Sequence, residues 1–495
     1  MKYFFSIILF LIVQLVYGQT TTPKREFRGA WIATIGNIDW PSKQGLDATM
    51  QQQEFIALID QMKENGLNAA IVQIRPCADA LYDSPFENWS KYLSGKQGVP
   101  PTPYYDPLEF MINECHKRCI EFHAWFNPYR ALVDANKNLN TATHCTNTHP
   151  NWFLNYGGKK YFDPGLPEVR EYFTNIVLDV VKRYDVDAIH FDDYFYPYRI
   201  AKQEFPDFKS YAKYGTNFPN KDDWRRNNVN TLIESLSKKI KKEKPYVKFG
   251  ISPFGVWRNY SKDPEGSVTN GGQTNYDDLF ADILLWLRKG WIDYALPQLY
   301  WEQGHHAADY DELINWWSRH AYGKNMYVGH ALYQIGTSTK ACWRSLNEMN
   351  EQVALTRSTP GINGSAFYSA NSFKKNCYGL NEDMKNNWYK TPSLLPSMPW
   401  IDSIPPASPK AESIITTNGF KQLNWTVSNP KQETLQFAVY RFEKGEQATI
   451  SASHLITIIR DNSYIDYASR NKKYKYVITA LDRLQNESIA SNVVE

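Results

Sequence analysis

Two adjacent carboxylates at the end of an apolar segment are the residues of this chain best suited to chemistry. Residues 186–192 are predicted to form a short buried strand that ends at Asp192, and Asp193 and an aromatic loop beginning at Tyr194 follow it. Ionised carboxylates are costly to bury, so a strand that ends in two of them is expected to deliver them to a cleft. There they could act as a general acid, a general base or a nucleophile.

Strand alternation separates the two aspartates. Ile189 and Phe191 would face surrounding helices, which places His190 and Asp192 on the interior face and Asp193 in the adjoining loop. We predict that Asp192 is nucleophile or base and that Asp193 is one of two candidates for the acid. The alternative is one catalytic group beside a structural cap or ion-pair partner.

Glu302 is the second candidate for the acid. Along residues 294–301, Leu299 lies on one face, so Gln298, Tyr300 and Glu302 share the other face and would line a cleft mouth. A carboxyl there could donate the proton that glycoside cleavage needs opposite a nucleophile or base. The alternative is a solvated loop glutamate.

Polar and aromatic residues near the ends of other predicted strands complete a candidate binding site. Their convergence from five strands favours a ligand cleft. The predicted substrate-binding residues are Trp31, Arg75, His123, Trp125, Asn127, Tyr129, Arg130, Asp163, His190, Tyr194, Trp257, Arg258, Gln298, Tyr300 and His330. The two arginines Arg75 and Arg130 could instead pair with nearby aspartates, and Asp163 also fits a turn before a helix that starts near Pro167.

The elements that would position these residues alternate eight times between residues 25 and 373. The predicted strands cover residues 27–35, 69–75, 121–127, 186–192, 248–254, 294–301, 326–332 and 364–370. The predicted helices cover residues 49–64, 107–119, 168–183, 224–242, 276–288, 309–320 and 343–355. This pattern predicts an α/β fold, a TIM (β/α)8 barrel, with its site at the carboxyl ends of the strands. A doubly wound open sheet is the rival, but no Gly-rich phosphate loop opens a helix.

The segments outside the barrel predict export and a second module. Residues 1–18 resemble a cleavable signal peptide, which would leave no transmembrane anchor on an exported, periplasmic or extracellular protein. An uncleaved anchor is the alternative, because Val13, Leu15 and Val16 extend the apolar run. The barrel would span residues 24–390, and the Pro-rich residues 391–410 would form a semi-rigid linker. Residues 411–495 alternate as short strands and resemble a fibronectin type III module, which could dock the enzyme on a surface or glycan.

Composition narrows the class of ligand. The 495 residues carry a net charge of +3, which is too small to indicate a nucleic-acid partner. Aromatic residues make up 15% of the chain, and their flat faces with polar tips suit sugars. The six cysteines have no zinc-type spacing, and no metal, Ser-nucleophile or phosphate-loop motif is present, so we expect neither a metal nor a cofactor.

Six blocks of sequence together resemble the glycosyl-hydrolase-like family ten. They are RGAWIAT at 28–34 with DWP at 39–41, HAWFNPYR at 123–130, DPG at 163–165, FDDYFY at 191–196, SPFGVWR at 252–258 and PQLYW at 297–301. The resemblance covers the barrel in order. It implies TIM-barrel glycosidases of exported or cell-envelope location, part of which is linked to cleavage of peptidoglycan glycan strands, especially strands without stem peptides. It also places Asp192 and Asp193 at the family's catalytic strand.

The sequence therefore predicts an exported glycoside hydrolase that cleaves a polysaccharide by paired-carboxylate catalysis, with peptidoglycan glycan as the leading substrate. A glycosidase of dietary, host or capsular polysaccharide is one alternative. A barrel that binds glycan without cleaving it is another, and a hydrolase of a non-sugar envelope component is a third.

Overall fold

A closed parallel barrel forms the larger part of the protein. The computed structural model describes residues 22–136, 141–428, 436–470 and 472–495, and the predicted signal segment 1–18 lies outside them. The barrel strands are β1 (Phe27–Ile32), β2 (Ala69–Arg75), β3 (Glu121–Phe126), β7 (Ala188–Phe191), β8 (Lys248–Ile251), β9 (Tyr294–Ala295), β10 (Asn325–His330) and β11 (Ile362–Phe367), paired in this order with β11 closing onto β1. The predicted TIM barrel is confirmed.

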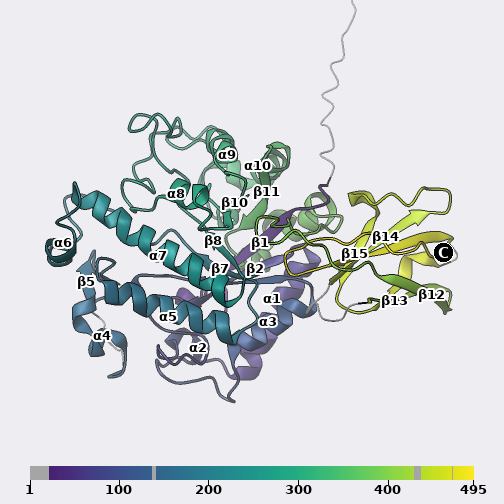
Figure 1. Cartoon of the computed structure of the whole chain (residues 1–495), viewed down its shortest axis with the longest axis horizontal. Coiled ribbons are helices and arrows are strands. Elements are labelled where there is room, and N and C mark those ends of the chain that lie inside the picture. Colours follow the sequence, from purple (N-terminus) through teal and green to yellow (C-terminus); the bar gives the residue numbers. More distant parts are fainter. Residues whose placement is uncertain (1–21, 137–140, 429–435, 471) are drawn as a thin grey trace, which may run out of the picture.

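Helices pack around the barrel between successive strands (Figure 1). They are α1 (Ala48–Glu64), α3 (Pro107–Lys117), α5 (Pro167–Arg183), α7 (Lys221–Glu243), α8 (Ile283–Arg288), α9 (Tyr310–Arg319) and α10 (Asn347–Ser358). Among the described residues, no helix is both long and apolar enough to cross a membrane.

Several predicted strands are a few residues shorter than the sequence indicated, and two elements are shortened the most. The helix predicted over 276–288 begins only at Ile283, because Asp278 accepts a hydrogen bond from the Thr274 backbone in a turn and Phe280 takes a positive φ of 53°. The strand predicted over 294–301 ends at Ala295, since Pro297 has no N–H to donate.

The core has an inner and an outer layer, as strand alternation requires. On β7, Ile189 and Phe191 belong to the cluster under the helices, whereas Ala188 belongs to the cluster inside the barrel. His190 also points inward, because its ring bonds Tyr294 across the barrel. The predicted facing of β7 is confirmed, and it directs Asp192, the next interior position, to the mouth.

The third βα connection carries a small antiparallel sheet of β4 (Arg130–Leu132), β5 (Phe153–Tyr156) and β6 (Lys159–Phe162). The chain then turns at Asp163, which accepts a hydrogen bond from the Gly165 N–H at 2.9 Å, and α5 begins at Pro167. This long connection leaves the carboxyl end of β3, which faces the barrel mouth.

The last part of the chain forms two three-stranded antiparallel sheets, drawn in yellow and green beside the barrel in Figure 1. Their strands are β12 (Lys410–Thr417), β13 (Phe420–Thr426) and β16 (Ser463–Asp466), and β15 (Leu455–Ile459), β14 (Gln436–Glu443) and β17 (Tyr474–Leu481). Trp425, Phe437 and Ile478 lie in a core that both sheets share. An all-β module after the barrel is confirmed; its fibronectin type III character stays a prediction.

This module docks on the amino-terminal end of the barrel, opposite the mouth. Arg483 pairs with Asp185, just before β7, at 2.5 Å, and Leu484 packs with Leu395 and Met398 under the barrel interior. The segment predicted to be a spacer is therefore packed against the barrel over these residues, because its apolar side chains are buried there.

Candidate active site

A cavity of about 250 Å³ opens at the carboxyl ends of the barrel strands and holds both aspartates of the predicted pair. Its lining residues are Trp31, Trp125, Asp192, Asp193, Tyr194, Tyr198, Ser252, Gln298, Tyr300, Tyr333 and Tyr368. Seven of these eleven residues are aromatic. In such a site the aromatic rings can pack against the apolar face of a sugar, and the two buried carboxyl groups can exchange protons with its oxygen atoms.

Asp192 is held by three donors from its own protein. The Trp125 Nε1–H donates to its Oδ2 at 3.0 Å, and the Asn127 amide donates to the same oxygen at 3.0 Å. Its Oδ1 receives two longer contacts, from the Tyr194 backbone N–H at 3.2 Å and from Asn127 at 3.3 Å. These contacts fix the carboxyl group in place and leave Oδ1 the more available to a ligand.

Asp193 lies beside it in a different environment. Tyr198 donates a short hydrogen bond to its Oδ2, and Gln298 also bonds it. Burial, together with the neighbouring charge of Asp192, raises the pKa of Asp193 to about 7, against the opposing effect of these hydrogen bonds. Burial also raises the pKa of Asp192, but Arg130 and the donors on Asp192 counteract that rise. Asp193 is thus the better proton donor of the pair.

A chain of hydrogen bonds supports the floor of the cavity. The Trp31 Nε1–H lies 3.4 Å from His190 Nε2 and can only donate, so His190 carries its proton on Nδ1 and donates it to the Tyr294 hydroxyl at 2.9 Å. The Tyr294 hydroxyl is also hydrogen-bonded to His123 Nδ1 at 2.8 Å, and His123 Nε2 is hydrogen-bonded to Glu121 at 3.1 Å. Burial lowers the pKa of His190 strongly, so this ring stays neutral and positions Trp31 rather than carrying charge.

Arg130 stands at the edge of the cavity. Its guanidinium lies 5.3 Å from the centre of the Tyr194 ring and bonds the Pro76 carbonyl at 3.1 and 3.2 Å. Its charge lowers the pKa of Asp192. The structure thus joins Trp31, Trp125, Asn127, Arg130, His190, Tyr194, Gln298 and Tyr300, all predicted from the sequence, around the aspartate pair.

Arg75 does not reach this cavity. Its side chain is fully buried and forms a two-pronged ion pair with Glu87 at 2.6 and 2.7 Å, over the rings of Phe162 and Phe173. A bulge in the pairing of β2 with β3 occurs between Gln73 and Arg75, and it turns Arg75 to the outer layer. Arg75 therefore supports the fold and does not line the cavity.

Six other predicted binding residues are also absent from the lining of the cavity. His123 and His330 are buried among polar partners, Tyr129 and Trp257 pack in the outer layer, Asp163 closes a turn, and Arg258 pairs with Asp263 and Asp277. Strand-end position alone does not distinguish these groups from true lining residues, because loops beyond a strand end can turn either way.

Glu302 is likewise separate from the aspartates. It does not line the cavity, and its Oε1 pairs with the Lys340 ammonium at 2.6 Å near the surface. Partial burial opposes its ionisation, but Lys340 outweighs that effect and lowers the pKa of Glu302. A carboxyl with these properties is a poor proton donor at neutral pH.

The ion pair of Arg75 gives a stability prediction. Glu87→Gln leaves a buried guanidinium without its counter-charge and is expected to lower the free energy of unfolding by about 3–5 kcal/mol while leaving KM unchanged. Chemical denaturation and steady-state kinetics would measure both. The control Asp60→Asn breaks an exposed pair with Arg118 and is expected to cost less than about 1 kcal/mol. A large rise in KM for Glu87→Gln would return Arg75 to the binding site.

Tyr198 and Tyr368 are lining residues that the sequence did not single out. Tyr368 directly follows the end of β11, and Tyr198 lies in the aromatic loop after the aspartates. The four aromatic residues of this loop within 194–198 were the available signal, but strand alternation does not extend into a loop. Ser252 and Tyr333 also line the cavity, just after β8 and β10.

Tyr198 gives a prediction on pH dependence. Its hydroxyl stabilises the ionised form of Asp193 and lowers the pKa of that carboxyl, so Tyr198→Phe is expected to raise it. The alkaline limb of the kcat profile would then move to higher pH. Tyr333→Phe is the matched control, because its hydroxyl bonds no other described residue in the cavity. An alkaline limb that stays in place for Tyr198→Phe would contradict this role.

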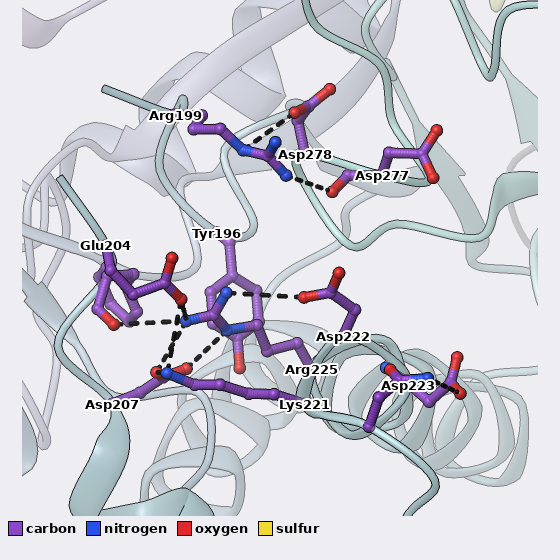
Figure 2. A network of polar contacts seen from close by, with 12 residues as sticks. Tyr196, Arg199, Glu204, Asp207, Lys221, Asp222, Asp223, Arg225, Asp277 and Asp278 are labelled. Atoms are coloured by element: carbon purple, nitrogen blue, oxygen red, sulfur yellow. Dashed lines mark hydrogen bonds and ion pairs between the residues drawn. The ribbon is translucent and has the colours of Figure 1, made fainter. Parts of the chain in front are cut away.

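An ion-pair network holds the loop that carries Tyr194 and Tyr198 (Figure 2). Arg225 at the start of α7 bonds both oxygens of Asp207 at 2.8 Å and Glu204 at 2.6 Å, and Lys221 adds a contact to Asp207 at 2.7 Å. Earlier in the loop, directly after Tyr198, Arg199 pairs with Asp278 at 3.2 Å. Each of these charged groups has an oppositely charged partner within the network. We therefore interpret the network as an anchor for the loop and assign no ligand to the cavity of about 450 Å³ that it borders.

Within the described residues, no group of three or more His, Cys, Asp or Glu side chains is arranged to hold a metal ion. The six cysteines form no disulfide there, and four of them are buried.

Comparison with known proteins identifies the family. A family model described as glycosyl hydrolase-like 10 matches residues 26–345. The chain belongs to this family. The protein is also 45% identical over 487 residues to glycosyl hydrolase YngK of Bacillus subtilis, covering 97% of this chain and 95% of that one. It is 38% identical to glycosyl hydrolase DigH of Escherichia coli over 72% of this chain and 85% of that one.

Family membership confirms the expectation of a glycoside hydrolase. Among solved structures, the glycoside hydrolase domain of PgaB from Bordetella bronchiseptica aligns with 74% of this chain and 99% of its own, at 12% identity and a TM-score of 0.47. A likeness this distant supports no inference about substrate.

Proposed function

We propose that this glycosyl hydrolase-like 10 protein is an exported enzyme that cleaves the glycan strands of peptidoglycan, with strands lacking stem peptides as the preferred form. The observation that carries the proposal is the pair of buried carboxyls in one aromatic cavity, one of them with a pKa near neutrality. The sequence resemblance and the signal-like residues 1–18 point to the cell envelope.

The roles follow from the two environments. Asp193, with a pKa raised to about 7, donates a proton to the glycosidic oxygen as the bond to the anomeric carbon breaks. Asp192 serves as the anion of the pair and stabilises the positive charge that develops on the sugar, since Arg130 and three donors oppose the rise in its pKa that burial causes. Glu302, paired with Lys340 outside the cavity, takes no part.

The size and lining of the cavity favour a bare glycan. About 250 Å³ accommodates roughly one sugar ring between flat side chains. A peptide attached to the bound sugar would have to leave through the same aromatic mouth, so stripped strands are expected to bind better.

Mass spectrometry of peptidoglycan digests tests the proposal. The purified mature protein would be incubated with intact sacculi and, in parallel, with glycan strands freed of peptides by an amidase. Release of sugar fragments from the stripped strands, with little from sacculi, is expected. No release from either would overturn the peptidoglycan assignment and direct the same assay to dietary, host and capsular polysaccharides. The first residue of the exported protein, expected at Gln19, would test signal cleavage.

A further inference from the structure

Both carboxyl groups of the site come from one wall of the cavity. Asp192 and Asp193 are consecutive residues at the end of β7. Asp192 bonds Trp125 and Asn127 on the β3 side, whereas Asp193 bonds Tyr198 and Gln298 on the other side. When protein groups alone do the chemistry, a second carboxyl must lie across the sugar from the acid. It lies about 6.5–9.5 Å away for direct displacement and about 5–5.5 Å away for two-step displacement.

The opposite wall supplies no such carboxyl among the described residues. Trp31, Tyr300, Tyr333 and Tyr368 line it. The buried acid Asp39, whose charge acts on Tyr368 of this wall, does not line the cavity. Its oxygens accept hydrogen bonds from the Ser369 hydroxyl and from the backbone N–H groups of Ala33 and Asn371 at 2.6–2.7 Å. An acid is therefore present without a protein nucleophile that faces it.

Asp192 is arranged to accept a hydrogen bond rather than to attack. Its Oδ2 already holds two donors at 3.0 Å, so attack through this atom would break both contacts. Its Oδ1 has the two longer contacts, at 3.2 and 3.3 Å, and one of these is shared with the Asn127 bond to Oδ2. Three donors thus face about four lone-pair sites, so Oδ1 can accept one more N–H. A fixed anion with one free acceptor position suits a ligand amide.

The aromatic wall offers a matching place for a methyl group and a carbonyl. The rings of Tyr300, Tyr333 and Tyr368 form a triangle with centroids 6.0–6.1 Å apart, and Trp31 lies 6.1 Å from Tyr368. The hydroxyls of the three tyrosines bond no other described residue, so they are available to a ligand. An acetamido group has the apolar end and the polar end that this wall would hold.

We propose, on the basis of the function above, that the nucleophile is the 2-acetamido group of the substrate, held by Asp192, and that the sugar bound at the cleavage site is a 2-acetamido-2-deoxy sugar. Asp193 protonates the leaving oxygen as the C1–O bond breaks, and the acetamido carbonyl oxygen bonds C1 to give an oxazolinium ion whose N–H donates to Asp192. Asp193, now ionised, takes a proton from water. The water oxygen then bonds C1, and the bond between C1 and the acetamido oxygen of the oxazolinium ring breaks. The amide is thereby restored, and the product retains its configuration.

The test compares stripped peptidoglycan strands with the same strands after chemical N-deacetylation. Wild-type protein is expected to cleave the acetylated strands with retention, followed by NMR of the new anomers, and to lose at least 100-fold in kcat/KM on the deacetylated strands. Equal cleavage of both, or inverted product, would overturn the acetamido mechanism and leave the glycosidase assignment standing. Cleavage of neither would overturn both.

A binding measurement makes the test independent of turnover. The methylthiazoline of N-acetylglucosamine, a stable mimic of the oxazolinium ion, is expected to bind the wild-type protein and Asp193→Asn, and to bind Asp192→Asn at least tenfold more weakly by calorimetry. Asp60→Asn, a surface carboxyl change far from the cavity, is the matched control and should bind as wild type. Equal affinity for Asp192→Asn and wild type, or a glycosyl-aspartate adduct found by mass spectrometry, would overturn the proposal.

Discussion

Asp193→Asn is expected to lower kcat about 10²–10⁴-fold on any glycan that the protein cleaves, because the amide cannot donate the proton that the leaving oxygen needs. In the wild-type protein the pKa of Asp193 lies at about 7, so kcat should fall as pH rises through that value and the acid form is lost. The variant should lack this alkaline limb. A pH series of kcat for both proteins measures the two effects, with Asp60→Asn as control.

The same substitution is expected to stabilise the folded protein. Unfolded Asp193 would release its proton near the ordinary aspartate pKa, whereas the folded form releases it only near 7, so ionisation of the unfolded chain removes stability between these values. Asn has no such penalty, and the gain should be greatest above about pH 7, on the order of 2 kcal/mol. Thermal unfolding at acidic and alkaline pH would show it. A variant that is less stable at alkaline pH and keeps wild-type kcat would contradict the assigned role.

The interior face of β7 could be predicted from the sequence because the two-residue period of a strand is a property of the backbone. That period placed His190 inward, and Asp192 follows at the next interior position. The barrel was equally accessible, since eight alternations of apolar strand and amphipathic helix leave few other closed arrangements.

The sequence failed where the period was interrupted. The bulge between Gln73 and Arg75 moves Arg75 to the outer layer, and Glu87, its partner, lies in a loop that no periodicity constrains. Beyond Pro297 the chain no longer follows a regular strand, so Tyr300 reaches the cavity while Glu302 turns to Lys340. Loop conformation depends on tertiary partners, which a single sequence does not display.

Asp192→Asn tests the other half of the pair and is expected to lower kcat about 10²–10³-fold, because a fixed negative charge that stabilises the developing positive charge is removed. Its second effect has a definite sign. The charge of Asp192 contributes to the raised pKa of Asp193, so its removal should lower that pKa and move the alkaline limb of kcat to lower pH. The shift is opposite to that expected for Tyr198→Phe, although both changes lie within the same cavity.

This opposition distinguishes charge coupling from general damage to the site. A distorted cavity would lower kcat in both variants without shifting their alkaline limbs in opposite directions. Coupling through Asp193 requires the alkaline limb to move to lower pH in Asp192→Asn and to higher pH in Tyr198→Phe. The double variant Asp192→Asn/Asp193→Asn should lose little more than the worse single variant, because the two carboxyls act on one transition state. Fully additive losses would show that Asp192 and Asp193 act independently.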